Sequence, residues 1–473
     1  MLFNSLTFVV FFAVVLALHR APFLSWRTKK VLLLVESYIF YAAWNPPFIV
    51  VLWISTVVDW VVAKRIHTAT TTGARRGWLL VSLLVNLGIL GYFKYGEFLL
   101  ENWVGVAAMA GVEWQAPAWD IVLPVGISFY TFQTMAYSLD VYLKRAEPAD
   151  SLLDFSLFVT FFPQLVAGPI VRPVDLVPQF AAEPAPQRGR LAWGLSLMVL
   201  GMFQKIVIAD GALAPASDAV FGATEKLAWT DAWLGTLAFS GQIFSDFAGY
   251  STTAIGASLA LGFSLGDNFR YPYAAIGFTD FWKRWHISLS TWLRDYLYVP
   301  LGGNRKGVGR TYINLMVTML LGGLWHGASW TFVVWGGLHG TYLAVERYIQ
   351  RRFHPHPLTH SLVFQMSLAM FTYFLVNITW VFFRAPDFAT AWRMITTMVT
   401  FGDGLKVLTS ANATLVAVPV LGILIIHGLM RERRLEDVVA RTPWWVTAFI
   451  VGFMLAAIMF SQGSSNAFIY FQF

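Results

Sequence analysis

Imidazole side chains are the groups in this sequence best suited to do chemistry. The chain has nine histidines and no cysteine. Three of the histidines fall in an aromatic-rich part of the chain: His286 in WHISLS, His326 in GLWHGASW and His339 in WGGLHG. Imidazole can take up and return a proton near neutral pH. The lack of cysteine excludes thiolate metal sites and acyl-cysteine intermediates, so any acyl transfer needs another group.

His326 lies where an apolar helix would end before it has crossed a bilayer. The run 311–325 rises about 1.5 Å per residue and so reaches roughly 22 Å, short of the about 30 Å of hydrocarbon. Gly323, Gly327 and Ser329 then indicate a turn inside the membrane, which is tolerated only beside a cavity. A titratable group at that depth usually marks a pathway or an active site. We therefore predict that His326 is a general base; the alternative is a histidine that only hydrogen-bonds neighbouring helices.

Three other polar groups carry less specific signals. His286 lies among tryptophans and basic residues, where it would touch a cytoplasmic acyl donor or a lipid phosphate, or simply anchor an interfacial helix. His339 follows His326 by thirteen residues, and packing and catalysis are equally expected there. Asp246 lies in an apolar run and needs a partner, so we expect it to make a structural hydrogen bond.

Basic side chains and a histidine-rich loop also need an interpretation. Lys283, Arg284 and Arg294 would either bind the phosphates of a coenzyme or anchor the chain at the membrane surface. The loop with His354, His356 and His360 favours a solvated cytoplasmic segment over a metal site. The sequence has no phosphate-binding Gly-Lys-Ser/Thr loop, no serine nucleophile elbow and no zinc motif. We expect neither a bound cofactor nor a metal.

The composition places these groups in a membrane protein. Of 473 residues, 57% are hydrophobic and 12% charged, against roughly 25% charged in soluble proteins. Aromatic residues make up 16%, and such rings favour the lipid headgroup boundary. The net charge of +7 comes from short clusters between apolar runs. That pattern fits cytoplasmic loops and argues against nucleic-acid binding.

Apolar runs predict twelve membrane crossings in one domain, residues 1–473. A further run, 151–169, is interrupted by prolines and is expected to be re-entrant or interfacial, enclosed by protein or facing a wet cavity. The predicted crossings are 2–18, 31–44, 47–64, 78–99, 121–142, 191–212, 231–262, 311–325, 329–349, 361–383, 413–430 and 443–461.

Loop charges predict the orientation. Basic clusters follow the first and third crossings, so those loops should be cytoplasmic, whereas the acidic loop 100–120 should face outward. Both termini would then be periplasmic. The first apolar run has no preceding charge and no cleavage site, so we interpret it as a retained helix.

Residues 266–310 are too polar to cross a membrane alone. Trp282, Trp285, Leu289 and Trp292 recur at intervals of three and four residues, which places them on one face of a helix. We predict an amphipathic or re-entrant helix partly sunk from the cytoplasmic side, followed by a catalytic helix hairpin at 311–349.

These motifs, in this order, resemble the membrane-bound O-acyltransferases, especially the branch with the bacterial alginate O-acetyltransferases. The resemblance covers nearly the whole chain. It rests on LPVGISFYTFQ (123–133), FSDFAGYS (244–251), DFWKRWHISLSTW (280–292) with LGGNR (301–305), LWHGASW (324–330) and WVFFRAP (380–386).

The resemblance implies an all-α ring of about twelve transmembrane helices, with re-entrant and interfacial helices around a thinned core and a through-membrane tunnel. It places the family's nearly invariant histidine on His326 and its second, more variable position on His286. We further expect substrate contacts from Trp325, Ser329, Trp285, Arg294 and Asp295.

The resemblance also implies the reaction: acetyl transfer from a cytoplasmic donor, acetyl-coenzyme A, to an extracytoplasmic polysaccharide such as alginate. The transfer would be direct or through a periplasmic acetyltransferase or relay partner, and the protein would reside among the lipids of a bacterial inner membrane. Acetylation of peptidoglycan or cellulose, D-alanyl transfer to teichoic acid, lipid or protein acylation, a transporter or flippase and a structural export subunit remain alternatives.

Overall fold

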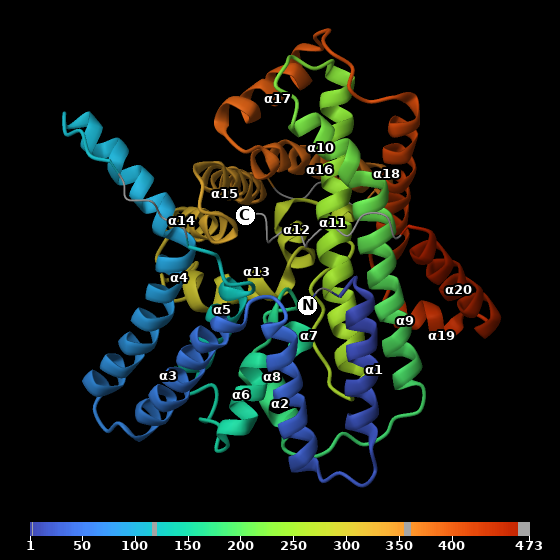
Figure 1. Ribbon diagram of the computed structural model, residues 1–473. Coiled ribbons are helices and arrows are strands. Elements are labelled where there is room, and N and C mark those ends of the chain that lie inside the picture. Colours follow the sequence, from blue (N-terminus) through green and yellow to red (C-terminus); the bar gives the residue numbers. More distant parts are fainter. Residues whose placement is uncertain (2, 116–120, 354–360, 462–473) are drawn as a thin grey trace. The chain divides into compact units, whose positions relative to one another are not determined.

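The computed structural model describes residues 1–473 except 2, 116–120, 354–360 and 462–473 (Figure 1). The histidines at 354, 356 and 360 therefore lie outside the described residues. Helices make up the described fold, which contains no β-strand. This part of the chain divides into two compact units, Met1–Leu195 with Ala254–Gly266 and Ser196–Thr253 with Asp267–Phe473.

Four helices of the first unit begin at hydroxyl caps. Ser5, Ser25, Thr71 and Ser151 each accept a hydrogen bond from a backbone N–H in the first turn, which satisfies one of the orphan donors there. The helices of this unit are α1 (Leu6–Arg20), α2 (Trp26–Ala42), α3 (Ile49–Thr68), α4 (Thr72–Met109), α5 (Ile127–Tyr142), α6 (Leu152–Thr160), α7 (Phe162–Leu165) and α8 (Pro173–Leu176), with the first residues of α9 (Arg190–Phe203).

The predicted interruption in run 151–169 is confirmed. Helix α6 ends at Thr160 and α7 begins at Phe162, with Pro163 in its first turn. The freed backbone finds partners inside the protein: the Phe162 N–H donates to Ser37 Oγ at 3.2 Å, and Phe158 O accepts from the Gln164 amide at 2.7 Å. These residues are buried, so the non-helical backbone is enclosed by protein, as its amide groups require.

The second unit holds the aromatic-rich segments. Its helices are α10 (Ala214–Phe221), α12 (Phe278–Arg284), α13 (Ile287–Leu293), α14 (Val308–His326), α15 (Trp330–Arg352), α16 (Leu362–Arg384), α17 (Phe388–Thr400), α18 (Ser410–Met430), α19 (Leu435–Arg441) and α20 (Trp444–Phe460), together with most of α11 (Trp229–Ala260). Two π-helical segments, Gln204–Leu213 and Arg294–Tyr298, interrupt the regular pattern. Such segments frequently mark functional sites.

Five helical segments within the described ranges are long and apolar enough to cross a membrane. They are Pro46–Thr68, Thr72–Met109, Arg190–Phe221, Leu362–Arg384 and Ser410–Met430, and the apolar helices α1 and α20 are shorter. The chain is a multi-pass membrane protein. The ring of twelve crossings, its tunnel and the single-domain organisation stay predictions.

The prediction that Trp282, Trp285, Leu289 and Trp292 lie on one face of a continuous helix is wrong. Helix α12 ends at Arg284 and α13 begins at Ile287, because His286 adopts a left-handed backbone conformation, φ 43° and ψ 56°. Trp285 and Leu289 are fully buried and Trp292 nearly so. The three- and four-residue spacing of these apolar side chains therefore indicates that they are buried against protein. It does not indicate a continuous helix.

The predicted helix hairpin after run 311–325 is confirmed. Helix α14 ends at His326, three residues form the turn, and α15 begins at Trp330 with Ser329 as its cap. The two backbones are in close contact, since a Cβ on Gly323 would lie 2.2 Å from Phe332 O and one on Gly336 would lie 2.2 Å from Met319 O. Small residues that bring helix backbones together are characteristic of packing in membranes.

Candidate active site

His326, the last residue of α14, is enclosed by aromatic rings. Its side chain is 2% exposed. Ring centroids lie 4.9 Å away for Trp335 on α15, 5.4 Å for Phe383 on α16 and 5.1 Å for the neighbouring Trp325. Each contact is edge-on, which is a favoured aromatic geometry. Three helices therefore fix the position of this imidazole.

His286 contacts the same centre from the break between α12 and α13. Its ring lies 6.3 Å from that of His326 and 5.9 Å from that of Trp325, and the edge of Phe247 on α11 packs against it at 4.7 Å. The residue is outside the five candidate spans and is fully buried. Burial lowers the pKa of His286 to about 3, so the ring is neutral at physiological pH. Because His286 is buried in the protein, it does not anchor an interfacial helix at the membrane surface.

His339 extends the cluster along α15. Trp335 lies between the two histidines of the hairpin, 4.9 Å from the ring of His326 and 4.8 Å from that of His339. The Nε2 atom of His339 is 3.0 Å from Thr379 Oγ1, and the residue is fully buried. The structure thus places all three histidines of the aromatic-rich region in one continuous cluster.

The predicted substrate contacts fall into two groups. Trp325 touches both imidazoles, and Trp285 is fully buried against Trp380, with ring centroids 5.0 Å apart. Ser329 accepts from the Thr331 N–H and so caps α15. Arg294, whose side chain is 61% exposed, pairs with the adjacent Asp295 at 2.6 Å. The structure therefore places Trp325 against both imidazoles, buries Trp285 among other aromatic rings and leaves Arg294 at the protein surface.

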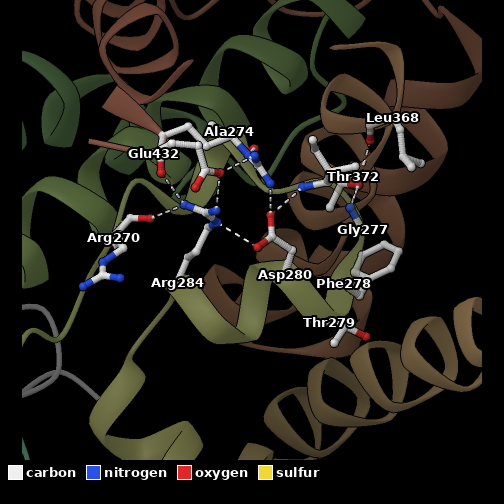
Figure 2. A network of polar contacts seen from close by, with 12 residues as sticks. Arg270, Ala274, Gly277, Phe278, Thr279, Asp280, Arg284, Leu368, Thr372 and Glu432 are labelled. Carbon is white, nitrogen blue, oxygen red and sulfur yellow. Dashed lines mark hydrogen bonds and ion pairs between the residues drawn. The ribbon is translucent and has the colours of Figure 1, made fainter. Parts of the chain in front are cut away.

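Arg284 belongs to an ionic network that holds α12 in place (Figure 2). Its Nε donates to Asp280 at 2.8 Å and its Nη2 to Glu432 at 3.1 Å, while Arg431 donates to the other oxygen of Asp280 at 2.8 Å. Burial alone would raise the pKa of Asp280, but the Ile276 N–H and the two guanidinium groups outweigh it and lower the pKa. Arg284 is nine-tenths buried here, so the structure gives it a structural role.

The N-terminus of α12 is anchored separately. Glu346 on α15 accepts from the backbone N–H groups of Phe278 and Thr279 at 2.6 and 3.1 Å, which is favourable at a helix N-terminus. The Gly277 N–H donates to Thr372 on α16 at 3.0 Å, a contact visible in Figure 2. The segment that carries His286 is therefore tied down at both ends of α12.

Asp246 has the partner that its apolar surroundings demand. Lys205, in the π-helical segment Gln204–Leu213, lies 2.5 Å from Asp246 and 2.8 Å from Asp210, and all three are buried. The prediction that this carboxylate is paired is confirmed, though the partner is a lysine. Sequence reasoning missed this lysine, the glutamate cap and Asn268, the hydrogen-bond partner of His286; only the basic charge inside an apolar run could have drawn attention to Lys205.

Comparison with known proteins decides the family. The family model described as "MBOAT, membrane-bound O-acyltransferase family" matches residues 145–366, which include His286 and His326. The probable alginate O-acetylase AlgI of Azotobacter vinelandii is 43% identical over 378 residues, 80% of this chain and 74% of that protein. The chain belongs to the membrane-bound O-acyltransferase family. The predicted resemblance and the enzyme class, a membrane-bound O-acyltransferase, are confirmed.

Other relatives in the family extend the comparison. The probable alginate O-acetylase AlgI of Pseudomonas aeruginosa is 42% identical over 417 residues, 88% of this chain and 78% of that protein. The peptidoglycan O-acetyltransferase of Helicobacter pylori is 37% identical over 401 residues, 78% of this chain and 73% of that protein. Both matches cover most of either chain, so the similarity extends well beyond the segment that holds the histidines.

Proposed function

We propose that this membrane-bound O-acyltransferase transfers acetyl groups from a cytoplasmic donor across the inner membrane for O-acetylation of an extracytoplasmic polysaccharide similar to alginate. The main support is the pair of enclosed imidazoles, His326 and His286, with ring centroids 6.3 Å apart. Two relatives over 40% identical carry the name of an alginate O-acetylase. Acetylation of peptidoglycan, the reaction named for the Helicobacter pylori relative, is the second candidate.

In the proposed reaction His326 acts as the general base. It takes the proton of an acceptor hydroxyl as the hydroxyl oxygen attacks the carbonyl carbon of an acetyl thioester. The new C–O bond forms, the C–S bond breaks, and the proton passes to the leaving thiolate. A positioned base of this kind typically contributes about 10²- to 10⁴-fold in rate. The aromatic enclosure of His326 supports this role, because it fixes the position of the ring.

The donor and the partners belong to the same proposal. Acetyl-coenzyme A would supply the acetyl thioester from the cytoplasm, and the acceptor would be the polysaccharide itself or a periplasmic acetyltransferase that completes the transfer. Both termini would face the periplasm. Reporter fusions at residue 1 and at residue 473 test this orientation, since two periplasmic signals are expected and a cytoplasmic signal from either end would contradict it.

The decisive experiment measures ester-linked acetate on the polysaccharide of cells with and without the protein. Expression of His326→Ala at wild-type membrane levels should leave acetate at the background of the deletion strain. His67→Ala, which removes an exposed histidine paired with Glu147, is the control and should retain acetylation. Normal acetate with His326→Ala would overturn the assignment of the base. Acetate on peptidoglycan but not on the exopolysaccharide would select the second candidate.

A further inference from the structure

Asn268 contacts His286 in an arrangement that the reaction outlined above does not use. It is 1% exposed. Its Oδ1 lies 3.1 Å from His286 Nδ1, 3.3 Å from the backbone N of Ser288 and 2.9 Å from Ser288 Oγ. Its Nδ2 donates to Ser251 Oγ at 3.0 Å. The carboxamide therefore has partners on both sides.

These contacts determine which nitrogen of His286 carries the hydrogen. A backbone N–H can only donate, so the carboxamide atom that faces Ser288 N must be the oxygen. Since that same oxygen faces His286 Nδ1, the imidazole must donate from Nδ1. In the neutral ring the lone pair then lies on Nε2. A flipped carboxamide would set an NH₂ group against the Ser288 N–H, which is repulsive.

The backbone of Asn268 also supports the unusual conformation of His286. The Ile287 N–H donates to Asn268 O at 2.9 Å, directly after the left-handed residue. A non-glycine residue held in that region costs of order 1–3 kcal/mol and persists only where surrounding contacts enforce it. Such strain clusters at active sites. Side chain and backbone of one asparagine thus hold both the ring and the strained peptide.

We propose that Asn268 is a positioning residue that keeps His286 in the Nδ1–H tautomer, so that Nε2 presents a hydrogen-bond acceptor to the centre shared with His326. This inference rests on the proposed acetyl transfer. With ring centroids 6.3 Å apart, the nitrogens of the two rings approach no closer than about 4 Å, which exceeds a direct hydrogen bond of about 2.8–3.0 Å. One water molecule between the rings can bond to both.

In that geometry the acceptor atom of His286 stabilises the proton that His326 takes up. When His326 becomes an imidazolium, it donates to the bridging water, which in turn donates one of its own hydrogens to Nε2 of His286. No bond to carbon changes in this step, and the proton leaves with the thiolate as before. The role parallels that of a buried group that orients a catalytic histidine and stabilises its charged form.

Charged groups around His286 are already paired with one another. On the 267–270 segment Asp267 pairs with Arg270, on α12 Arg284 pairs with Asp280, and on α11 Asp246 pairs with Lys205. His326 is the titratable group that faces it from α14. A carboxylate introduced at residue 268 would therefore be a new charge in direct contact with the imidazole.

Two substitutions at residue 268 test the role. Asn268→Leu keeps the size but removes the acceptor, and it should lower kcat by about 10- to 100-fold with little change in KM, as for other partners that orient a functional histidine. Asn268→Asp keeps every accepted hydrogen bond and favours the charged ring, so it should restore much of the rate and move the acidic limb of the pH–rate profile upward by about one pH unit or more. A wild-type kcat for Asn268→Leu would overturn the inference. So would an acidic limb of the pH–rate profile that stays at its wild-type position in Asn268→Asp.

A measurement of the tautomer separates this inference from the proposed function. In ¹⁵N-histidine-labelled protein in lipid bilayers, the His286 signals are those lost in His286→Gln. We expect a protonated Nδ1 and an unprotonated Nε2 in the wild type, and loss of this pattern in Asn268→Leu. That result in a protein that transfers no acetyl groups would refute the proposed function alone. A protonated Nε2 in an active enzyme would refute the inference alone.

Discussion

The contact between α14 and α15 predicts that one methyl group at Gly323 disables the enzyme. A Cβ at this position would lie 2.2 Å from the carbonyl oxygen of Phe332, whereas real Cβ atoms essentially never approach other heavy atoms within 3.0 Å. Gly323→Ala must therefore separate the two backbones by about 0.8 Å at that point. The atom that the new Cβ would meet belongs to the backbone of α15, so no side-chain rotation can relieve the clash.

The displacement acts three residues from His326. A misplacement of about 1 Å at a reacting group can cost 10²-fold in rate, so we expect Gly323→Ala to lower the acetylation rate by about that factor. Overpacking should also cost about 1–3 kcal/mol of stability, partly offset by up to about 1 kcal/mol from the better helix propensity of alanine. Activity should therefore fall much further than the thermal midpoint.

Gly337→Ala is the matched control. It adds the same methyl group to α15, but its Cβ would meet only a side-chain carbon of Leu320 at 3.4 Å, an ordinary contact distance. Polysaccharide ester acetate and the thermal midpoint of purified protein should both remain near wild type. The same amount of ester acetate and the same thermal midpoint for Gly323→Ala and Gly337→Ala would contradict the predicted clash between α14 and α15.

Two other predictions concern buried charge and pH. Lys205→Met leaves two buried carboxylates without their cation and should cost about 3–5 kcal/mol; adding Asp246→Asn should recover part of the thermal midpoint, and an additive loss would contradict the pairing. Burial lowers the pKa of His286 from 6.5 in the unfolded chain to about 3 in the folded protein. Below about pH 6.5 the unfolded chain therefore binds a proton at this residue and the folded protein does not. Protonation stabilises the unfolded state, so the folded protein loses stability as the pH falls. Between pH 7.5 and 5 this amounts to about 2 kcal/mol, so the midpoint of His286→Gln should fall less than that of the wild type; equal falls would exclude a neutral buried ring.

What the sequence predicted well was set by local chemistry. The end of α14 at His326 followed from the length of the apolar run and the glycines and serine after it, and the structure places the turn there. The interruption of 151–169 likewise followed from Pro163, which fixes its own backbone whatever surrounds it. In both cases the determining residues lie within a few positions of the feature.

The failures arise where distant residues decide the outcome. Periodicity described which side chains around Trp285 are buried, but it could not reveal that a carboxamide 18 residues away would hold His286 in a left-handed conformation. Arg284 looked like a phosphate ligand or a membrane anchor, although one partner, Asp280, lies only four positions earlier; the other, Glu432, is 148 positions further along the chain. A basic residue near an apolar run has the same local sequence whether it meets a lipid phosphate or a carboxylate of the protein.

The two imidazoles are held in place by different kinds of contact. His326 depends on close backbone packing between α14 and α15, which tolerates no added atom at Gly323. The position of His286 depends on hydrogen bonds to Asn268 and on the ionic network through Arg284, which hold the short break between α12 and α13. A rigid apolar contact positions a ring but leaves its tautomer undecided, whereas directed hydrogen bonds select the tautomer. In the proposed reaction His326 therefore gains and loses a proton, whereas His286 keeps its proton on Nδ1.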